Sequence, residues 1–250
     1  MMQKYRYASI GLTHEGLVRP HNEDSHLVRE DVGVWIVADG MGGHENGRWA
    51  SSTVVAAVEG VVVVGNFEQD VAMVAKAIQA ANQIIYDASV AAGKRMGSTV
   101  VGLVIGGTRF ACLWTGDSRI YLLRNGQLTR LTRDHTQVQE LLDRGALSAE
   151  EAADHPMAHV LSHAVGVEAP MRLDIIADEV GPRDIFLLCS DGLTDVVSEP
   201  EIAEQLAGLD PRAAGRRLLE LALSRGGPDN VTVVSVACEE MTALTLPGDA

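Results

Sequence analysis

Apolar residues along the chain fall into two kinds of segment. Short runs rich in Val, Ile, Leu and aromatic residues, bounded by turn-forming residues, predict β-strands. These strands cover residues 5–13, 33–38, 98–105, 109–115, 119–123, 173–180, 184–190 and 231–238. Longer segments in which apolar residues recur every three or four positions predict helices. These helices cover residues 47–58, 67–92, 136–144, 149–153, 199–206 and 211–224.

The strand-rich middle of the chain contains a strong hairpin signal. Asn125-Gly126 stands between two strand-like runs, 120–124 and 127–131. Consecutive strands joined by hairpins are antiparallel, so the order of elements suggests two packed antiparallel sheets with helices outside. No internal repeat or Pro/Ser-rich linker divides the chain, and we expect a single domain over residues 1–240 with a short tail at 241–250.

Composition narrows the class of protein. The chain has 250 residues, 46% of them hydrophobic, and a formal net charge of −14. This balance argues against nucleic acid and anionic membrane as main partners, because both need a basic face. The chain shows no signal-peptide pattern and no apolar run long enough to cross a bilayer, so we expect a cytoplasmic protein. Cys112, Cys189 and Cys238 lie in strand-like runs without a C-x-x-C pair, which favours buried reduced thiols.

Candidate chemistry lies where apolar runs stop at an acid. Asp39, Asp117 and Asp191 follow strand-like runs, and Asp229 opens the last one. A carboxylate at the edge of a core is costly unless it meets positive charge, and few Lys or Arg flank these sites. Bound divalent cations are therefore the simplest source of the missing positive charge, and oxygen ligands favour Mg²⁺ or Mn²⁺. The alternative is that an Asp-Gly pair such as Asp39-Gly40 only makes a turn after a strand.

A second cluster lies upstream of these acids. Arg19 is followed closely by Asn22, Glu23 and Asp24. The cluster is interpreted either as a surface ion pair or as a phosphate clamp, since the guanidinium fork matches two phosphate oxygens. The residues alone leave both interpretations open.

Seven segments in order resemble the motif series of the type 2C (PPM) protein phosphatases, in their bacterial branch. The resemblance extends from about residue 8 to residue 238. The motifs are Arg19-x-x-Asn22-Glu23-Asp24, Asp39-Gly40-Met41-Gly42-Gly43-His44, Gly97-Ser98-Thr99, Gly116-Asp117-Ser118-Arg119, Thr132-Arg133-Asp134-His135-Thr136, Ser190-Asp191-Gly192-Leu193 and Asp229-Asn230-Val231-Thr232.

The resemblance implies an α+β fold, a four-layer α-β-β-α sandwich in which two antiparallel sheets are flanked by helices. It implies a metal-dependent protein serine/threonine phosphatase that reverses a Ser/Thr kinase by hydrolysing phosphoserine and phosphothreonine with a hydroxide activated by two metals. Its expected cofactors are two Mn²⁺ or Mg²⁺ ions in the core site and a third ion, and its expected partners are phosphorylated proteins and a cognate kinase.

The resemblance also implies roles for single residues. Asp39 would bridge two metals, completed by the Gly40 carbonyl, Asp191 and Asp229. The other roles are Glu23 and Asp24 holding metal-bound waters, Arg19 binding the substrate phosphate, and Asp117 helping to form the third metal site.

Some positions depart from the family pattern. Met41 replaces a His that many eukaryotic members carry there as a proposed general acid, so a metal-bound water is the preferred proton donor and His44 an alternative. His163 stands where the family often has Arg. A pseudo-phosphatase that only binds phosphoproteins is the competing function, but it is disfavoured because Asp39, Asp191 and Asp229 are all present. An unrelated two-metal nuclease is disfavoured by the acidic charge.

Three histidines, His155, His159 and His163, recur at four-residue intervals. Pro156 suits a first helical position, so we expect His159 and His163 on one side of a helix, next to a flap that the family carries beside its active site. The two side chains are interpreted as a structural pair or as a pH-sensitive hinge of the flap. A zinc site is disfavoured because the sequence offers no Cys or nearby acid to complete the ligands.

Overall fold

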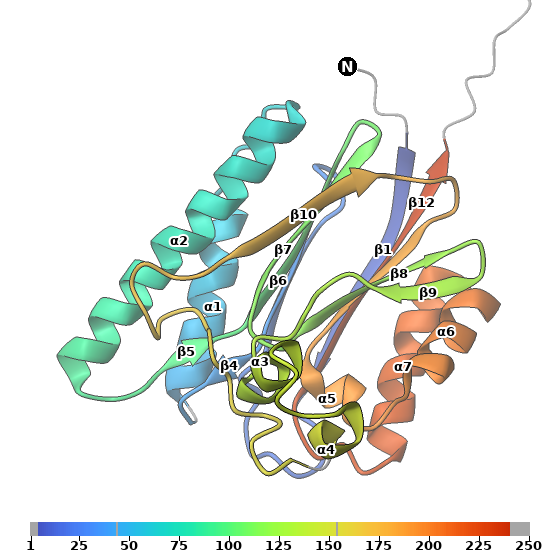
Figure 1. Cartoon of the computed structure of the whole chain (residues 1–250). Helices are drawn as coiled ribbons and strands as arrows, with labels where there is room; N and C mark the ends of the chain where they lie inside the picture. The colour runs from blue at the N-terminus through green and yellow to red at the C-terminus, as the bar shows by residue number, and fades with distance from the viewer. Residues whose placement is uncertain (1–4, 44, 154, 241–250) are drawn as a thin grey trace, which may run out of the picture.

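Two antiparallel five-stranded sheets form the centre of the computed structural model, which describes residues 5–43, 45–153 and 155–240 (Figure 1). The first sheet contains, in spatial order, β1 (Tyr5–His14), β12 (Val231–Glu240), β11 (Ile185–Cys189), β8 (Arg119–Arg124) and β9 (Gln127–Arg130). The second contains β10 (Asp174–Glu179), β7 (Arg109–Thr115), β6 (Val100–Gly106), β3 (Val34–Ala38) and β2 (Ser25–Arg29). A further two-stranded ladder pairs β4 (Gly40–Met41) with β5 (Gly97–Ser98).

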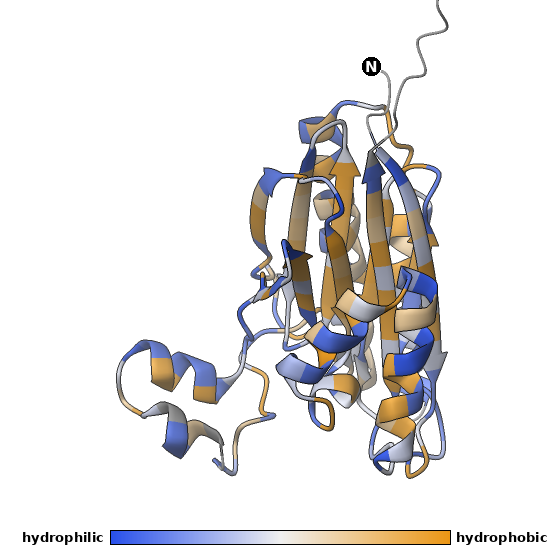
Figure 2. Ribbon diagram, turned by 90° about the vertical axis from the view of Figure 1, so that its right-hand side faces the viewer, coloured by the Kyte–Doolittle hydropathy of each residue, from blue (hydrophilic) through white to orange (hydrophobic). Residues whose placement is uncertain are grey.

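The main core lies between the two sheets. In β3, Trp35 and Val37 point into this core, whereas Val34 and Ile36 point into a second core under the helices. Successive side chains of a strand point to opposite faces, so a strand with helices on one side and a sheet on the other is apolar on both. In Figure 2 the strands at the centre of the sandwich accordingly carry much hydrophobic colour on both faces.

Helices cover the outer faces of both sheets. The second sheet is covered by α1 (Glu45–Glu59) and α2 (Phe67–Ala92), and the first sheet by α6 (Glu199–Gly208) and α7 (Pro211–Ser224) (Figure 1). This arrangement confirms the expected α+β fold with four α-β-β-α layers. Within the described residues, no helix combines the length and apolar character needed to cross a membrane.

The segment between β9 and β10 carries two short helices, α3 (Gln137–Asp143) and α4 (Ala149–Ala153), and stands away from the sandwich (Figure 2). We call residues 131–163, with Asp154 outside the described part, the flap. Its base is tied to the sandwich by His135, whose backbone N–H donates to Gly116 O (2.8 Å) and whose ring is buried next to Trp114.

The histidine helix predicted after Pro156 is wrong. Residues 156–159 form turns in which hydrogen bonds join residues three positions apart. Backbone groups that a helix would pair locally are bonded instead to residues distant in the chain. Gln137 N–H donates to Val160 O (2.9 Å), and Ser162 N–H donates to His135 O (2.9 Å). His159 and His163 therefore do not share a helix face. Whether the pair is structural or a pH-sensitive hinge of the flap stays a prediction.

Other boundaries also differ from the prediction. The strand β2 was not predicted, because only Leu27 among its residues is buried and the alternation is weak. The run predicted as one strand over 98–105 is divided at Thr99, whose N–H donates to Asp39 O (2.8 Å). The short helix α5 (Asp191–Thr194) was also missed, since one turn carries no periodic signal.

The cysteine prediction is confirmed, because Cys112, Cys189 and Cys238 are free and buried. The tail expected at 241–250 and His44 lie outside the described residues. The division into one domain and a tail stays a prediction.

Candidate active site

The candidate site lies at one edge of the sandwich, where β3, β7 and β11 end and β12 begins. The antiparallel register places the last residue of β11, Cys189, opposite Val233 near the start of β12. The last residue of β7, Thr115, lies opposite Val100 at the start of β6. The acids that follow or precede these strand ends therefore meet in space, although they are separated by up to 190 positions in the chain (Asp39 to Asp229).

The backbone of Asp39 is fixed by the junction between β5 and β6. Its N–H donates to Thr99 Oγ1 (3.1 Å), and its carbonyl accepts from Thr99 N–H (2.8 Å) and from Ser98 Oγ (2.9 Å). Thr99 Oγ1 in turn shares a hydrogen bond with Ser118 Oγ (2.6 Å), next to Asp117. The Gly97-Ser98-Thr99 motif thus holds two of the candidate acids in register.

Gly40 lies where the backbone must come close to two other segments. Its N–H donates to Glu23 O (3.2 Å), and a Cβ at this position would clash with the backbone oxygens of Gly47 and Glu23. A Cβ on Gly47 would in turn clash with the Glu23 carboxylate. These two glycines let Glu23 lie against the loop after β3, next to Asp39.

Asp24 is buried and connects three segments. Its Oδ2 accepts hydrogen bonds from Ser190 Oγ (2.8 Å) and Thr232 Oγ1 (2.7 Å). Its Oδ1 is buried without a hydrogen-bond partner among the described residues. Burial is the largest cause that raises the Asp24 pKa to about 7, partly offset by the two hydroxyl donors. A buried carboxylate oxygen left unpaired indicates a cation or a water that would complete the site.

The remaining acids repel one another. Burial, followed by the charges of Asp24 and Asp191, raises the pKa of Asp39 well above its usual range. Burial, followed by the charge of Asp191, does the same for the pKa of Asp117, which is 8% exposed. Burial raises the pKa of Asp191 to about 6, with Asp195 and Asp229 as the next causes. The site therefore concentrates more negative charge than the nearby basic side chains neutralise.

Arg19 brings positive charge to the rim of this cluster. Its Nη2 donates to Asp229 Oδ2 (2.7 Å), while its side chain is 55% exposed. The hydrogen bond to Asp229 is the largest cause that raises the Arg19 pKa. Both alternatives for the upstream cluster are thus compatible with the geometry: Arg19 forms an ion pair, and it does so beside the acids, where a phosphate clamp would have to lie.

Asn230 positions the loop that carries Arg19 and Glu23. Its Oδ1 accepts from Glu23 N–H (2.8 Å), and its Nδ2 donates to Glu15 O (2.8 Å) and His21 O (2.9 Å). This role was not assigned from the sequence, although Asn230 belongs to one of the quoted motifs. The loop partners lie more than 200 residues away in the chain, so no local sequence pattern predicts the contact.

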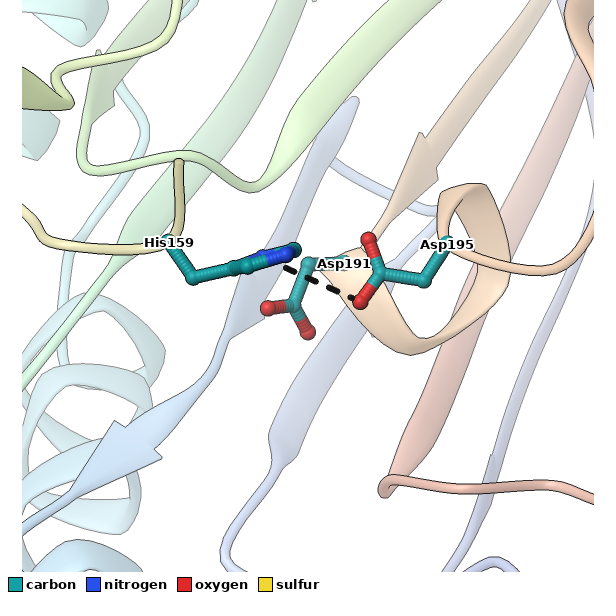
Figure 3. Close-up of side chains that lie close together, drawn as sticks. All are labelled: His159, Asp191 and Asp195. Atoms are coloured by element: carbon teal, nitrogen blue, oxygen red, sulfur yellow. Dashed lines mark ion pairs between the residues drawn. The ribbon is translucent and has the colours of Figure 1, made fainter. Parts of the chain in front are cut away.

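Asp195 near the acids was also missed, and His159 was singled out only as part of a structural pair or a flap hinge. Asp195 lies one turn after Asp191 on the segment that begins with α5, and His159 comes from the flap. Single ligand atoms of His159, Asp191 and Asp195 lie within 4.8 Å of one another, with Asp191 between the other two in Figure 3. The expectation that no acid lies near this histidine is wrong, because the fold brings two acids from more than 30 residues away. The spacing of Asp191 and Asp195 on one helical face was the available signal.

The donor set fits hard divalent cations. Carboxylate and carbonyl oxygens predominate, the three cysteines lie within the sheets, and Asp24 Oδ1 has no protein partner. Such oxygen sites suit Mg²⁺ or Mn²⁺ and not the softer metals that thiolates select.

The profile of the family described as Protein phosphatase 2C matches residues 17–222. This chain belongs to that family. It is 41% identical over 239 residues to the serine/threonine protein phosphatase PstP of Mycobacterium tuberculosis, a match that covers 92% of this chain and 44% of PstP. The chain thus spans less than half the length of that relative.

Solved structures of the family share the fold. The structure of PppA from Pseudomonas aeruginosa superimposes with a TM-score of 0.87 at 39% identity, covering 93% of this chain and 97% of PppA. The catalytic domain of PstP in complex with two manganese ions gives a TM-score of 0.80 at 37% identity, covering 94% of this chain and 99% of that one. These likenesses confirm the family resemblance on which the sequence interpretation rests.

Proposed function

We propose that this chain is a protein serine/threonine phosphatase. The observation that carries the proposal is the convergence of Asp39, Asp117, Asp191 and Asp229 at one sheet edge, with Arg19 at its rim. A site with this much uncompensated negative charge would repel a phosphate monoester unless bound cations neutralised the charge. Membership of the phosphatase family and the manganese-bound relative support the same function.

The residues of the site would bind the metal ions in different ways. Asp39, the Gly40 carbonyl, Asp191 and Asp229 would hold two Mn²⁺ or Mg²⁺ ions, with Glu23 and Asp24 holding the waters of those ions and Asp117 contributing to a third. When bound, the ions supply an activated water nucleophile and neutralise charge on the phosphoryl oxygens. No side chain of the protein has to act as a nucleophile.

The protein's own side chains would position the substrate and the metal-bound waters and neutralise the charge of the phosphate. Arg19 would exchange part of its contact with Asp229 for two phosphoryl oxygens of the substrate, which its exposed guanidinium can reach from solvent. Asp24 is oriented by Ser190 and Thr232, so its free Oδ1 has one direction in which to accept a hydrogen bond. Met41, which follows Gly40, carries no exchangeable proton, so the proton for the leaving hydroxyl must come from water or another group.

We further propose that the substrates are phosphorylated proteins made by a Ser/Thr kinase, which would place the protein in a signalling pathway. The expected cytoplasmic location stays a prediction.

The test of this function is release of inorganic phosphate from a phosphothreonine peptide. With Mn²⁺ or Mg²⁺ the protein should release phosphate, and excess EDTA should stop the reaction until metal is restored. Duplex DNA should remain intact under the same conditions. Full activity in EDTA, or no phosphate release with either metal, would contradict the proposal.

A further inference from the structure

A groove of about 730 Å³ extends from the acids to the C-terminal end of α2. Asp39, Asp117 and Asp191 lie at one end, and Lys94 and Arg95 are among the residues that line it. This volume is well beyond what a phosphate group needs, so most of the groove is available to other parts of a substrate.

The walls of the groove are held by hydrogen bonds to buried groups. Asn82, buried on α2, accepts Gly166 N–H at Oδ1 (2.6 Å) and donates from Nδ2 to Glu168 O (2.9 Å). Ser98 and Val165 exchange two backbone hydrogen bonds (3.0 and 2.8 Å). The strip that contains residues 164–168 is therefore docked onto α2 and β5, and the groove exists before any substrate enters.

Apolar side chains are exposed inside this groove. Val90, on the last turn of α2, is 64% exposed, and Val167, on the docked strip, is 52% exposed. Both line the groove, together with Tyr86. Apolar groups placed at solvent beside a catalytic centre are typical of a surface that receives a ligand.

Lys94 and Arg95 contrast with the charge of the rest of the site. Both side chains are exposed, and within the described part of the chain neither forms an ion pair or a side-chain hydrogen bond. Their backbone is nevertheless fixed, because Lys94 N–H donates to Ser89 O (3.2 Å) and Ser89 Oγ donates to Lys94 O (2.6 Å). Two adjacent cations on a fixed turn, in a protein of net charge −14, form a local site for an anion.

We propose that this groove binds the segment next to the phosphorylated residue and that Lys94 and Arg95 select substrates with an acidic group in that segment. The proposal rests on the proposed phosphatase function and names its substrate class. The phosphorylated residue lies at the acids, the chain beside it passes over Val90 and Val167, and a carboxylate or a second phosphate meets the two cations. Both sources share the same anionic chemistry.

The alternative is that the two cations only stabilise the fold. A cation near the C-terminal end of a helix interacts favourably with the helix dipole. That effect would change the melting temperature and leave the choice among peptides untouched, so substrate selectivity separates the two roles.

The experiment uses phosphothreonine peptides of one length and neutral sequence, in which a single Glu is moved through about six positions on either side, a reach of about 20 Å. The wild type should hydrolyse the best Glu peptide with a kcat/KM about tenfold above that of the neutral peptide, and added salt should reduce the difference. Replacing that Glu by phosphoserine distinguishes a carboxylate site from a second-phosphate site.

The variant Lys94→Gln/Arg95→Gln should remove the preference through KM, while a small aryl phosphate, which occupies only the acidic end, keeps its kinetics. The matched control is Arg216→Gln/Arg217→Gln, which makes the same change of net charge at exposed positions on α7. The charge reversal Lys94→Glu/Arg95→Glu should transfer the preference to peptides that carry Lys.

Equal kcat/KM for Glu and neutral peptides at every position would overturn the groove proposal, as would a preference that survives in Lys94→Gln/Arg95→Gln. Both results leave the phosphatase function intact, because the phosphothreonine peptides are still hydrolysed. Failure to hydrolyse any phosphorylated substrate would instead contradict the proposed function.

Discussion

At the scale of single residues, the acids of the site are fixed through their backbones while their carboxylates remain short of positive charge. Asp39 illustrates this division, since Thr99 and Ser98 bind its main chain and four other acids surround its side chain. Such an arrangement costs stability in the folded protein and is retained for what binds there.

Asp39→Asn should separate the effect of this charge on catalysis from its effect on stability. Loss of the bridging charge should lower kcat by at least ~10³ in saturating Mn²⁺. The same change removes a repelling charge, so the metal-free variant should melt at a higher temperature than the metal-free wild type. Kinetics and thermal unfolding measure the two, with Asp31→Asn at an exposed position as control. A variant that keeps wild-type kcat would show that Asp39 holds no catalytic metal.

Arg19→Ala should act mainly on substrate binding. We expect a rise in KM equivalent to about 1.5–3 kcal/mol of lost charge-assisted hydrogen bonding. Stability should change little, because the Arg19–Asp229 ion pair is exposed on the arginine side. Arg19→Lys should restore only part of the affinity, since an ammonium lacks the fork. Arg6→Ala, at an exposed position of β1, is the control, and wild-type kinetics for Arg19→Ala would place the phosphate clamp elsewhere.

At the scale of elements, the site is a meeting of strand ends and turns. Asp39 follows β3 directly and Asp191 begins α5 one residue after β11, whereas Asp117 lies on the turn between β7 and β8. The flap adds His159 near Asp191 and Asp195 without belonging to either sheet. The carboxylate of Asp117 can therefore be removed independently of the segments that carry Asp39, Asp191 and Asp229.

Asp117→Ala tests this independence. It should lower turnover and leave two tight metal sites, because the turn that carries Asp117 is separate from the segments that carry Asp39, Asp191 and Asp229. Calorimetric titration with Mn²⁺ measures the number of tight sites, and Asp178→Ala on the exposed face of β10 is the matched control. Loss of both tight sites in Asp117→Ala would contradict the assignment of this residue to a third ion.

Secondary structure was predictable where an element's own residues decide it. The bounds of α2 and β7 agree with the prediction at both ends, since α2 is capped by Asn66 and Gly93 and its apolar period is long. The histidine segment after Pro156 was not predictable, because backbone bonds from Gln137 and to His135 replace the helix that local preference favours.

At the scale of the whole molecule, the charge of the site links metal binding to stability. Asp24 and Asp191 have pKa values of about 7 and about 6 in the folded protein, against an ordinary value of 3.8. Between pH 4 and pH 7 the folded state therefore binds more protons than the unfolded state. These two groups make the free energy of unfolding of the metal-free protein fall as the pH rises through this window.

Denaturant unfolding in EDTA should accordingly give a more stable protein near pH 5.5 than near pH 7.5. Mn²⁺ at 100 times its dissociation constant should add about 2.7 kcal/mol, and it should do so most effectively at the higher pH, where the carboxylates are free of protons. Asp24→Asn should flatten the pH dependence in EDTA. A metal-free protein whose stability is constant or rises over this window would contradict the link.

The sequence by itself determined the layers of the fold, the family and most of the acids, because periodicity, turn residues and short motifs are local properties. Only the tertiary structure decided which groups meet. The unpaired oxygen of Asp24, the contact of His159 with Asp191 and Asp195, and the groove that joins Val90 to Val167 each combine segments that are distant in the chain. Such contacts depend on how the sheets, helices and flap pack against one another, and no single stretch of residues encodes that packing.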